Sequence, residues 1–114
     1  MNFLKYLNES TWNKKKAIDF IANVEPLFIK SNIQVEIVGS VKENGESEND
    51  LDLLVIKKTP KSKEKLIKEL ELNKDKFNIE RLEDINDIVT LILKPDRRVV
   101  DIMFTAKRRN KWSL

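Results

Sequence analysis

Apolar residues recur along the chain at helical spacing first and at strand spacing afterwards. Between Trp12 and about Lys30 they fall three or four residues apart, which predicts an amphipathic helix. The residues of this stripe are Ala17, Phe20, Ile21, Val24, Leu27 and Phe28. Ser10 or Thr11 is the predicted N-cap, and Pro26 is expected to kink the helix or to end its regular part. From Ile33 to Val38 apolar and polar residues alternate, as in a half-buried strand.

The middle of the chain predicts a polar connection, a strand and a second helix. Gly39 to Asn49 is polar and contains two glycines, so a loop or a short turn of helix is expected there. Leu51 to Ile56 is an almost continuous apolar run, which is typical of a buried central strand. Thr59 and Pro60 then open a helix, whose predicted inner face carries Leu66, Ile67 and Leu70.

Three extended segments follow, at about Phe77 to Leu82, Ile88 to Leu93 and Arg98 to Phe104. The segment Lys94 to Arg97 contains Pro and Asp between the last two, which predicts a hairpin turn. The predicted order is therefore helix, strand, strand, helix, strand, strand, strand. This order favours an α+β fold with a mixed sheet and helices packed on one face, in a single domain spanning residues 1–114.

Composition removes several kinds of chemistry. The 114 residues include no Cys and no His, which excludes a thiolate or imidazole metal site and a Ser-His-Asp triad. Chemistry must then depend on carboxylates, hydroxyls, Lys, Arg or a hard metal ion bound by oxygens. The chain has no apolar run long enough for a membrane span, and Met1 to Leu7 lacks the features of a secretory signal. We therefore expect an intracellular protein, cytoplasmic or nuclear, with no membrane partner.

Positive charge gathers in clusters although the formal net charge is only +3. One cluster is Lys14 to Lys16 and a second is Arg97 with Arg98. A third lies near the end of the chain and consists of Lys107, Arg108, Arg109 and Lys111. Such clusters suit a polyanionic partner such as nucleic acid, although solvated lysine surfaces and docking surfaces for acidic proteins have the same composition.

Two carboxylates interrupt the strand predicted at Leu51 to Ile56. Asp50 and Asp52 are two residues apart, so in a strand they project from the same face, about 6.6 Å apart along the chain. Two like charges on a buried element cost free energy unless a cation neutralises them. Mg²⁺ and Mn²⁺ prefer carboxylate oxygens, and the pattern therefore indicates a metal site.

Asp101 is a third carboxylate within an apolar strand, Val99 to Phe104. If this strand lies beside the first, Asp101 completes a site for two ions roughly 3.5–4 Å apart. Asp50 and Asp52 are then expected to bridge the ions, and Asp101 to bind the ion that activates an attacking hydroxyl. The alternative is that each Asp marks a strand end or pairs with a Lys or Arg.

Gly39 and Ser40 end the first strand and begin the polar loop. A glycine lets the backbone approach a ligand closely, and a serine hydroxyl with nearby amides can hold phosphate oxygens. Gly-Ser is also a common turn dipeptide, so the combination with the carboxylates carries the functional indication.

These residues together resemble the signature of the DNA polymerase beta-type nucleotidyltransferase superfamily. Gly39-Ser40 is followed by Asp50-Leu51-Asp52 as in that superfamily, and Arg97-Arg98-Val99-Val100-Asp101 resembles a strand of the family X DNA polymerase palm. The resemblance implies a palm domain that transfers a nucleotidyl group from a Mg²⁺–nucleoside triphosphate to a hydroxyl acceptor, as in DNA repair. It implies the catalytic and metal-binding residues Asp50, Asp52 and Asp101; the nucleotide-binding residues Gly39, Ser40 and Lys42; and the nucleic-acid-binding residues Arg97, Arg98, Lys107, Arg108, Arg109 and Lys111.

The chain departs from the family X pattern in two places. Glu43 stands where a phosphate-binding Arg is usual, and Asn49 replaces the Gly that usually precedes the first Asp. The thumb and the N-terminal DNA-binding domains of the family are also missing from this chain. Three alternatives therefore stay open: a minimal antitoxin nucleotidyltransferase that modifies a partner protein, a non-catalytic palm remnant that binds nucleic acid, and one fragment of a larger polymerase whose partner supplies the missing domains.

Overall fold

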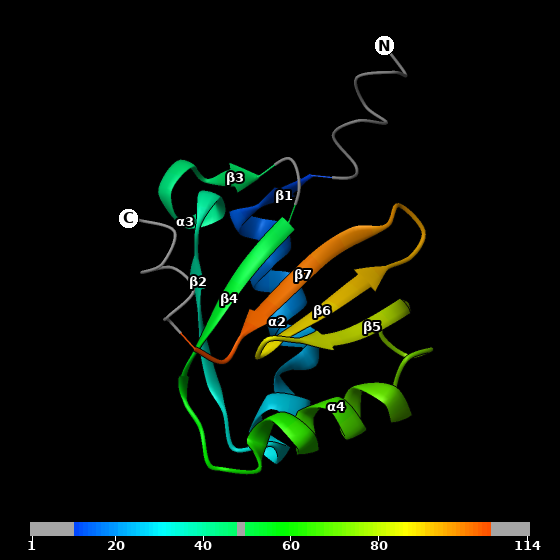
Figure 1. The fold of residues 1–114 in the computed structure, drawn as a ribbon. Coiled ribbons are helices and arrows are strands. Elements are labelled where there is room, and N and C mark those ends of the chain that lie inside the picture. Colours follow the sequence, from blue (N-terminus) through cyan, green and yellow to red (C-terminus); the bar gives the residue numbers. More distant parts are fainter. Residues whose placement is uncertain (1–10, 48–49, 106–114) are drawn as a thin grey trace.

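The computed structural model describes residues 11–47 and 50–105, which form a mixed α+β fold (Figure 1). Its main sheet has five strands in the order β2-β4-β7-β6-β5. Strands β4 and β7 run parallel, and the other neighbouring pairs run antiparallel. The predicted α+β class and mixed sheet are thus confirmed. The strands span Gln34–Val38 (β2), Asp50–Lys57 (β4), Ile79–Ile85 (β5), Ile88–Leu93 (β6) and Arg98–Met103 (β7).

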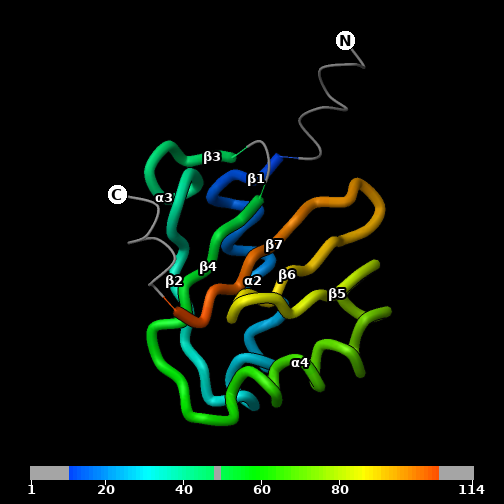
Figure 2. The backbone as a smooth tube through the Cα atoms, in the orientation of Figure 1, coloured from blue at the N-terminus to red at the C-terminus, as the bar shows by residue number. Residues whose placement is uncertain are grey.

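Helices α2 (Lys14–Lys30) and α4 (Ser62–Leu72) pack against one face of this sheet. In Figure 2 α2 runs behind the strands, and α4 crosses near their lower end. The core between the layers contains residues from both helices and from the three central strands, among them Ala17, Val24, Leu66, Leu70, Leu51, Leu53, Leu91, Val100 and Ile102. The packing of these helices on one face, predicted from the order of the elements, is therefore confirmed. None of the described helices is long and apolar enough to cross a bilayer.

The start of α2 differs from the prediction. The helix begins at Lys14, and its N-cap is Asn13, whose side-chain oxygen accepts a hydrogen bond from the Lys16 backbone N–H at 2.8 Å. Trp12 instead belongs to β1 (Trp12–Asn13), which pairs with β3 (Glu46–Ser47). Thr11 is not the cap, and Ser10 lies outside the described residues. The helix also continues through Pro26 to Lys30, so that Pro26 does not end it.

Strand β4 is buried on one face only, whereas the sequence predicted burial on both. Leu51, Leu53 and Val55 face the helices and are 0–8% exposed. Asp50 and Asp52 are half-buried on the opposite side, and Ile56 is 53% exposed. The reason is that α2 and α4 cover a single side of the sheet. The other side, which carries Asp50 and Asp52 on β4, is called the open face below.

The connections agree with the prediction, but some element bounds differ. Helix α4 begins at Ser62, so Thr59 and Pro60 precede it and do not open it as predicted. The polar segment after β2 contains the short helix α3 (Ser40–Asn44), as expected. Residues 94–97 form the predicted turn between β6 and β7, which pair antiparallel. Phe77 lies in the turn after α4, so β5 begins two residues later than predicted, at Ile79. Strand β7 ends at Met103, and Phe104 is a bend residue whose side chain remains in the core.

Candidate functional site

Strand register brings the predicted carboxylates together. Asp52 on β4 is the direct neighbour of Asp101 on β7, and the two strands lie side by side in Figure 1. Thr90 on β6 is in turn opposite Asp101. Residues directly opposite one another in a sheet project from the same face. Asp50 shares that face because it lies two residues before Asp52.

The three carboxylates form a tight cluster on the open face. One oxygen from each of Asp50, Asp52 and Asp101 lies within 4.8 Å of the other two. All three residues are half-buried, so the cluster is still reached by solvent. Three carboxylate oxygens this close form the hard, oxygen-only ligand set that Mg²⁺ and Mn²⁺ prefer.

Burial and mutual repulsion disfavour the simultaneous ionisation of all three carboxyl groups in the cluster. The pKa of Asp50 is raised from 3.8 to about 7, first by burial, then by the hydrogen bond with Asp101 and the negative charges of Asp52 and Asp101. In the part of the chain that the structure describes, no Lys or Arg forms an ion pair with Asp50 or Asp101. A divalent cation would supply the compensating charge, and the residues present therefore fit a metal ion.

Thr90 also belongs to the site, which was not predicted from the sequence. Its hydroxyl donates a hydrogen bond of 2.7 Å to Oδ1 of Asp101. This bond fixes the orientation of one carboxylate oxygen. The signal in the sequence was the same as for Asp101: one polar residue interrupts an apolar strand, here between Val89 and Leu91.

Gly39 is held directly against Asp52. It follows β2 with φ +75° and ψ −151°, a region that is essentially restricted to glycine. A Cβ added at this residue would lie 2.5 Å from Oδ2 of Asp52. Ser40, Lys42 and Glu43 follow on α3 with exposed side chains. The structure thus places Gly39 at the carboxylate cluster and leaves Ser40 and Lys42 accessible to a ligand.

The two arginines before Asp101 are engaged elsewhere. Arg98 is three residues from Asp101 on the same strand, so its side chain leaves the opposite, helix-covered face. There its guanidinium lies 4.8 Å from the Trp12 ring, and its Nε forms an ion pair with Asp96 at 3.1 Å. Arg97 pairs with Glu80 at 3.0 Å. Nucleic-acid binding by both arginines stays a prediction.

The third basic cluster was predicted to bind nucleic acid together with these arginines. Its residues, Lys107, Arg108, Arg109 and Lys111, lie outside the described residues, and their predicted role also stays a prediction.

Comparisons of the chain with protein-family models, with curated proteins and with solved structures found no match.

Proposed function

We propose that the chain is a metal-dependent nucleotidyltransferase that transfers a nucleoside monophosphate from a nucleoside triphosphate to a hydroxyl group, with nucleic acid as the acceptor. The observation that carries the proposal is the cluster of Asp50, Asp52 and Asp101, whose carboxylate oxygens lie within 4.8 Å of one another on two parallel strands. The close packing of Gly39 against Asp52 supports it, because the same turn leads into the proposed phosphate-binding residues.

The carboxylates would hold two Mg²⁺ or Mn²⁺ ions. Asp50 and Asp52 would be ligands, and Asp101 would be a ligand that also contacts the acceptor hydroxyl. When bound, such ions neutralise charge on the triphosphate and make an acceptor hydroxyl more acidic. Because the pKa of Asp50 is raised to about 7, this carboxyl group is protonated at low pH. It would have to lose that proton before it could bind a metal ion.

The remaining residues would position the reactants. Asp101 would help to accept the proton of the acceptor hydroxyl. The 2.7 Å hydrogen bond from the Thr90 hydroxyl would hold the Asp101 carboxylate in position for this step. The acceptor oxygen then forms a bond to the α-phosphorus as the bond to the leaving pyrophosphate breaks. Gly39 permits close approach of the backbone, and the exposed Ser40 and Lys42 would contact the phosphates. Catalysis of this type depends on positioning and charge neutralisation, which needs no His.

A labelling assay tests the proposal. The protein is incubated with Mg²⁺ or Mn²⁺, α-labelled nucleoside triphosphates, gapped DNA and a host lysate, beside an Asp101→Asn variant. Label on DNA that depends on Asp101 supports transfer to nucleic acid. Label on a protein band instead identifies a protein hydroxyl as the acceptor, as in an antitoxin nucleotidyltransferase. Absence of label above the variant on either acceptor would contradict an enzymatic function.

A further inference from the structure

A pocket lies on the helix-covered side of the sheet, away from the carboxylate cluster. It has a volume of about 320 Å³ and sits between the first turns of α2 and the turn that joins β6 to β7. Its lining includes Trp12, Lys16, Phe20, Asn23, Lys94 and Arg98. This volume lies at the lower end of the range of small-ligand sites.

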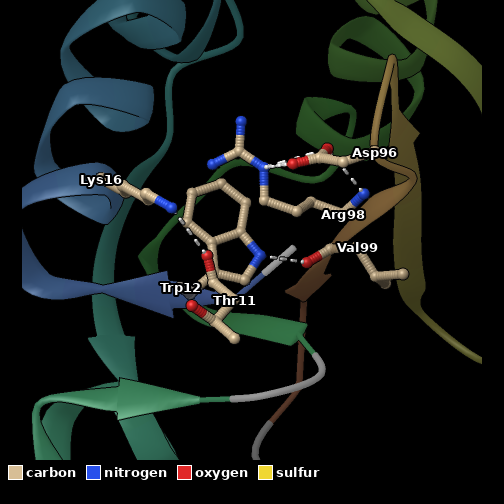
Figure 3. A network of polar contacts seen from close by, with 6 residues as sticks. All are labelled: Thr11, Trp12, Lys16, Asp96, Arg98 and Val99. Carbon is tan, nitrogen blue, oxygen red and sulfur yellow. Dashed lines mark hydrogen bonds and ion pairs between the residues drawn. The ribbon is translucent and has the colours of Figure 1, made fainter. Parts of the chain in front are cut away.

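The Arg98 guanidinium in this pocket is fixed from two sides. Trp12 lies under it at 4.8 Å, and Asp96 accepts its Nε–H at 3.2 Å (Figure 3). Figure 3 also shows that the two terminal nitrogens of Arg98 point away from Asp96. Because a planar guanidinium presents its donors as a fork, a fork held in place in this way is preorganised for an oxyanion.

Trp12 is itself held rigidly. Its indole N–H donates to the Val99 carbonyl at 2.9 Å, and its ring meets Phe20 edge to face, with centroids 5.8 Å apart. Only 1% of Trp12 is exposed, so that its ring supports Arg98 rather than stacking on a ligand. The support under Arg98 is therefore part of the core and does not depend on the ligand.

The charge of the lining also favours an anion. Lys16 and Lys94 line the same pocket as Arg98, and the amide of Asn23 adds a neutral donor. Asp19 is the one acidic residue in the lining, and it forms an ion pair with Lys15 at 3.3 Å. When the ion-pair partners Lys15 and Asp96 are counted with the lining, four cations and two carboxylates leave two positive charges, which match a dianion better than a single negative charge.

We propose that this pocket binds a phosphate monoester, with the Arg98 fork as the principal donor and Lys16 and Lys94 compensating the charge. A phosphodiester within a nucleic-acid strand has one negative charge, whereas a terminal phosphate approaches two at neutral pH. The ligand is therefore a free nucleotide or the phosphorylated end of a polynucleotide. The site is separate from the carboxylates and needs no divalent metal.

Fluorescence tests the pocket directly. The chain has two Trp residues, so a Trp112→Phe background leaves Trp12 as the reporter beneath Arg98. In EDTA, which removes metal from the carboxylate cluster, inorganic phosphate should change the Trp12 emission in a saturable way. Adenosine monophosphate and oligonucleotides with a 5′-phosphate or a 5′-hydroxyl are then titrated. Tighter binding of the 5′-phosphorylated oligonucleotide identifies a polynucleotide end, and tighter binding of the monophosphate identifies a free nucleotide.

Three variants decide whether the response comes from this pocket. Arg98→Lys keeps the charge but removes the fork, and we expect it to weaken phosphate binding at least tenfold. Lys94→Gln should also weaken it, and because Lys94 is exposed this variant leaves the packing on Trp12 intact. Arg81→Gln is the control: it removes the same charge from β5, where Arg81 pairs with Glu83 outside the pocket lining. No saturable response to phosphate, or an equal loss in the Arg81 variant, would overturn the proposal.

Discussion

A side chain at residue 39 would collide with the carboxylate of Asp52. A Cβ built on Gly39 lies 2.5 Å from Oδ2 and 3.3 Å from both Cβ and Cγ of Asp52. The backbone of Gly39, with φ +75° and ψ −151°, independently requires glycine. The turn after β2 therefore fixes one boundary of the carboxylate cluster, and substitution there should affect both folding and the site.

Gly39→Ala should lower the free energy of unfolding and disturb the metal site together. The backbone conformation alone costs about 1–3 kcal/mol for a residue with a Cβ, and the contact with Asp52 adds to this. We expect weaker Mg²⁺ binding and slower nucleotidyl transfer as Asp52 moves aside. Urea unfolding and a Mg²⁺ titration by calorimetry measure the two effects.

Gly45→Ala is the matched control for this substitution. Gly45 also has positive φ, +84°, but a Cβ there meets nothing within 4 Å. It should cost about 1–2 kcal/mol of stability for the left-handed conformation, with unchanged Mg²⁺ affinity. Equal effects of the two substitutions on Mg²⁺ binding would show that the contact between Gly39 and Asp52 is irrelevant to the site.

The pH dependence of the metal-free protein should carry the signature of Asp50. Its pKa in the folded protein, about 7, is above the unfolded value of 3.8, so the folded state binds the proton more tightly. The stabilisation from this proton is fully present below about pH 3.8 and is lost as the pH rises to about 7. Mg²⁺ competes with the proton, so Mg²⁺ affinity should rise with pH up to about 7 and then level off.

Carbon-detected NMR of the Asp carboxyl groups measures this titration. One carboxyl group should titrate near pH 7 in EDTA, and Mg²⁺ should shift its midpoint to lower pH. Asp50→Asn should remove that titration and flatten the pH dependence of urea unfolding between pH 4 and 7. A titration of Asp50 near its ordinary value would contradict the electrostatic picture of the cluster.

The sequence predicted the position of the carboxylates because the signal was local. An Asp within an apolar strand has few explanations, and a spacing of two residues puts Asp50 and Asp52 on one face. The prediction that Asp101 joins them depended on β7 lying beside β4, and the register of the sheet shows that it does. The same rule of alternation also places Arg98 on the other face, because an odd spacing separates it from Asp101.

Other features depend on contacts that no local pattern contains. The apolar pattern places Trp12 at the start of the helix, but its indole N–H donates to the Val99 carbonyl, 87 residues away in the chain. The two-residue strands β1 and β3 are too short to produce a periodic pattern. Thr90 interrupts an apolar strand as Asp101 does, but Thr is common in strands and this signal alone is weak. The register that sets Thr90 opposite Asp101 shows its role.

Thr90→Val should separate the hydrogen bond from the packing. Valine has nearly the same shape but cannot donate to Asp101, whose Oδ1 now accepts the hydroxyl at 2.7 Å. Loss of a partner that orients a metal ligand typically costs roughly 10–100-fold in metal affinity or activity, and we expect a loss in that range. Thr90→Ser keeps the hydroxyl and should restore Mg²⁺ binding. A Ser variant as defective as the Val variant would indicate a packing role only.

Glu43→Arg should strengthen binding of the nucleoside triphosphate. Glu43 is exposed on α3, four residues after Gly39, and its charge opposes that of a triphosphate. Reversing this charge should lower the KM for the triphosphate severalfold with little change in kcat. Glu46→Arg makes the same change of charge at an exposed residue of β3 and serves as the control. An unchanged KM in the Glu43 variant would mean that the triphosphate does not pass this helix.

Asp101→Asn should abolish transfer without unfolding the protein. The substitution removes one negative charge from the cluster, so the stability of the metal-free protein should stay the same or increase. Asparagine retains an oxygen that can accept a hydrogen bond from the Thr90 hydroxyl, which preserves the local packing.

Because the Asp101 charge and hydrogen bond raise the pKa of Asp50, the pKa of Asp50 should fall in the Asp101→Asn variant. Transfer should drop by about 10²–10⁴-fold, and Mg²⁺ binding should weaken. Urea unfolding in EDTA, NMR titration of Asp50 and the labelling assay test these points, and a variant that unfolds without metal would show that Asp101 is structural.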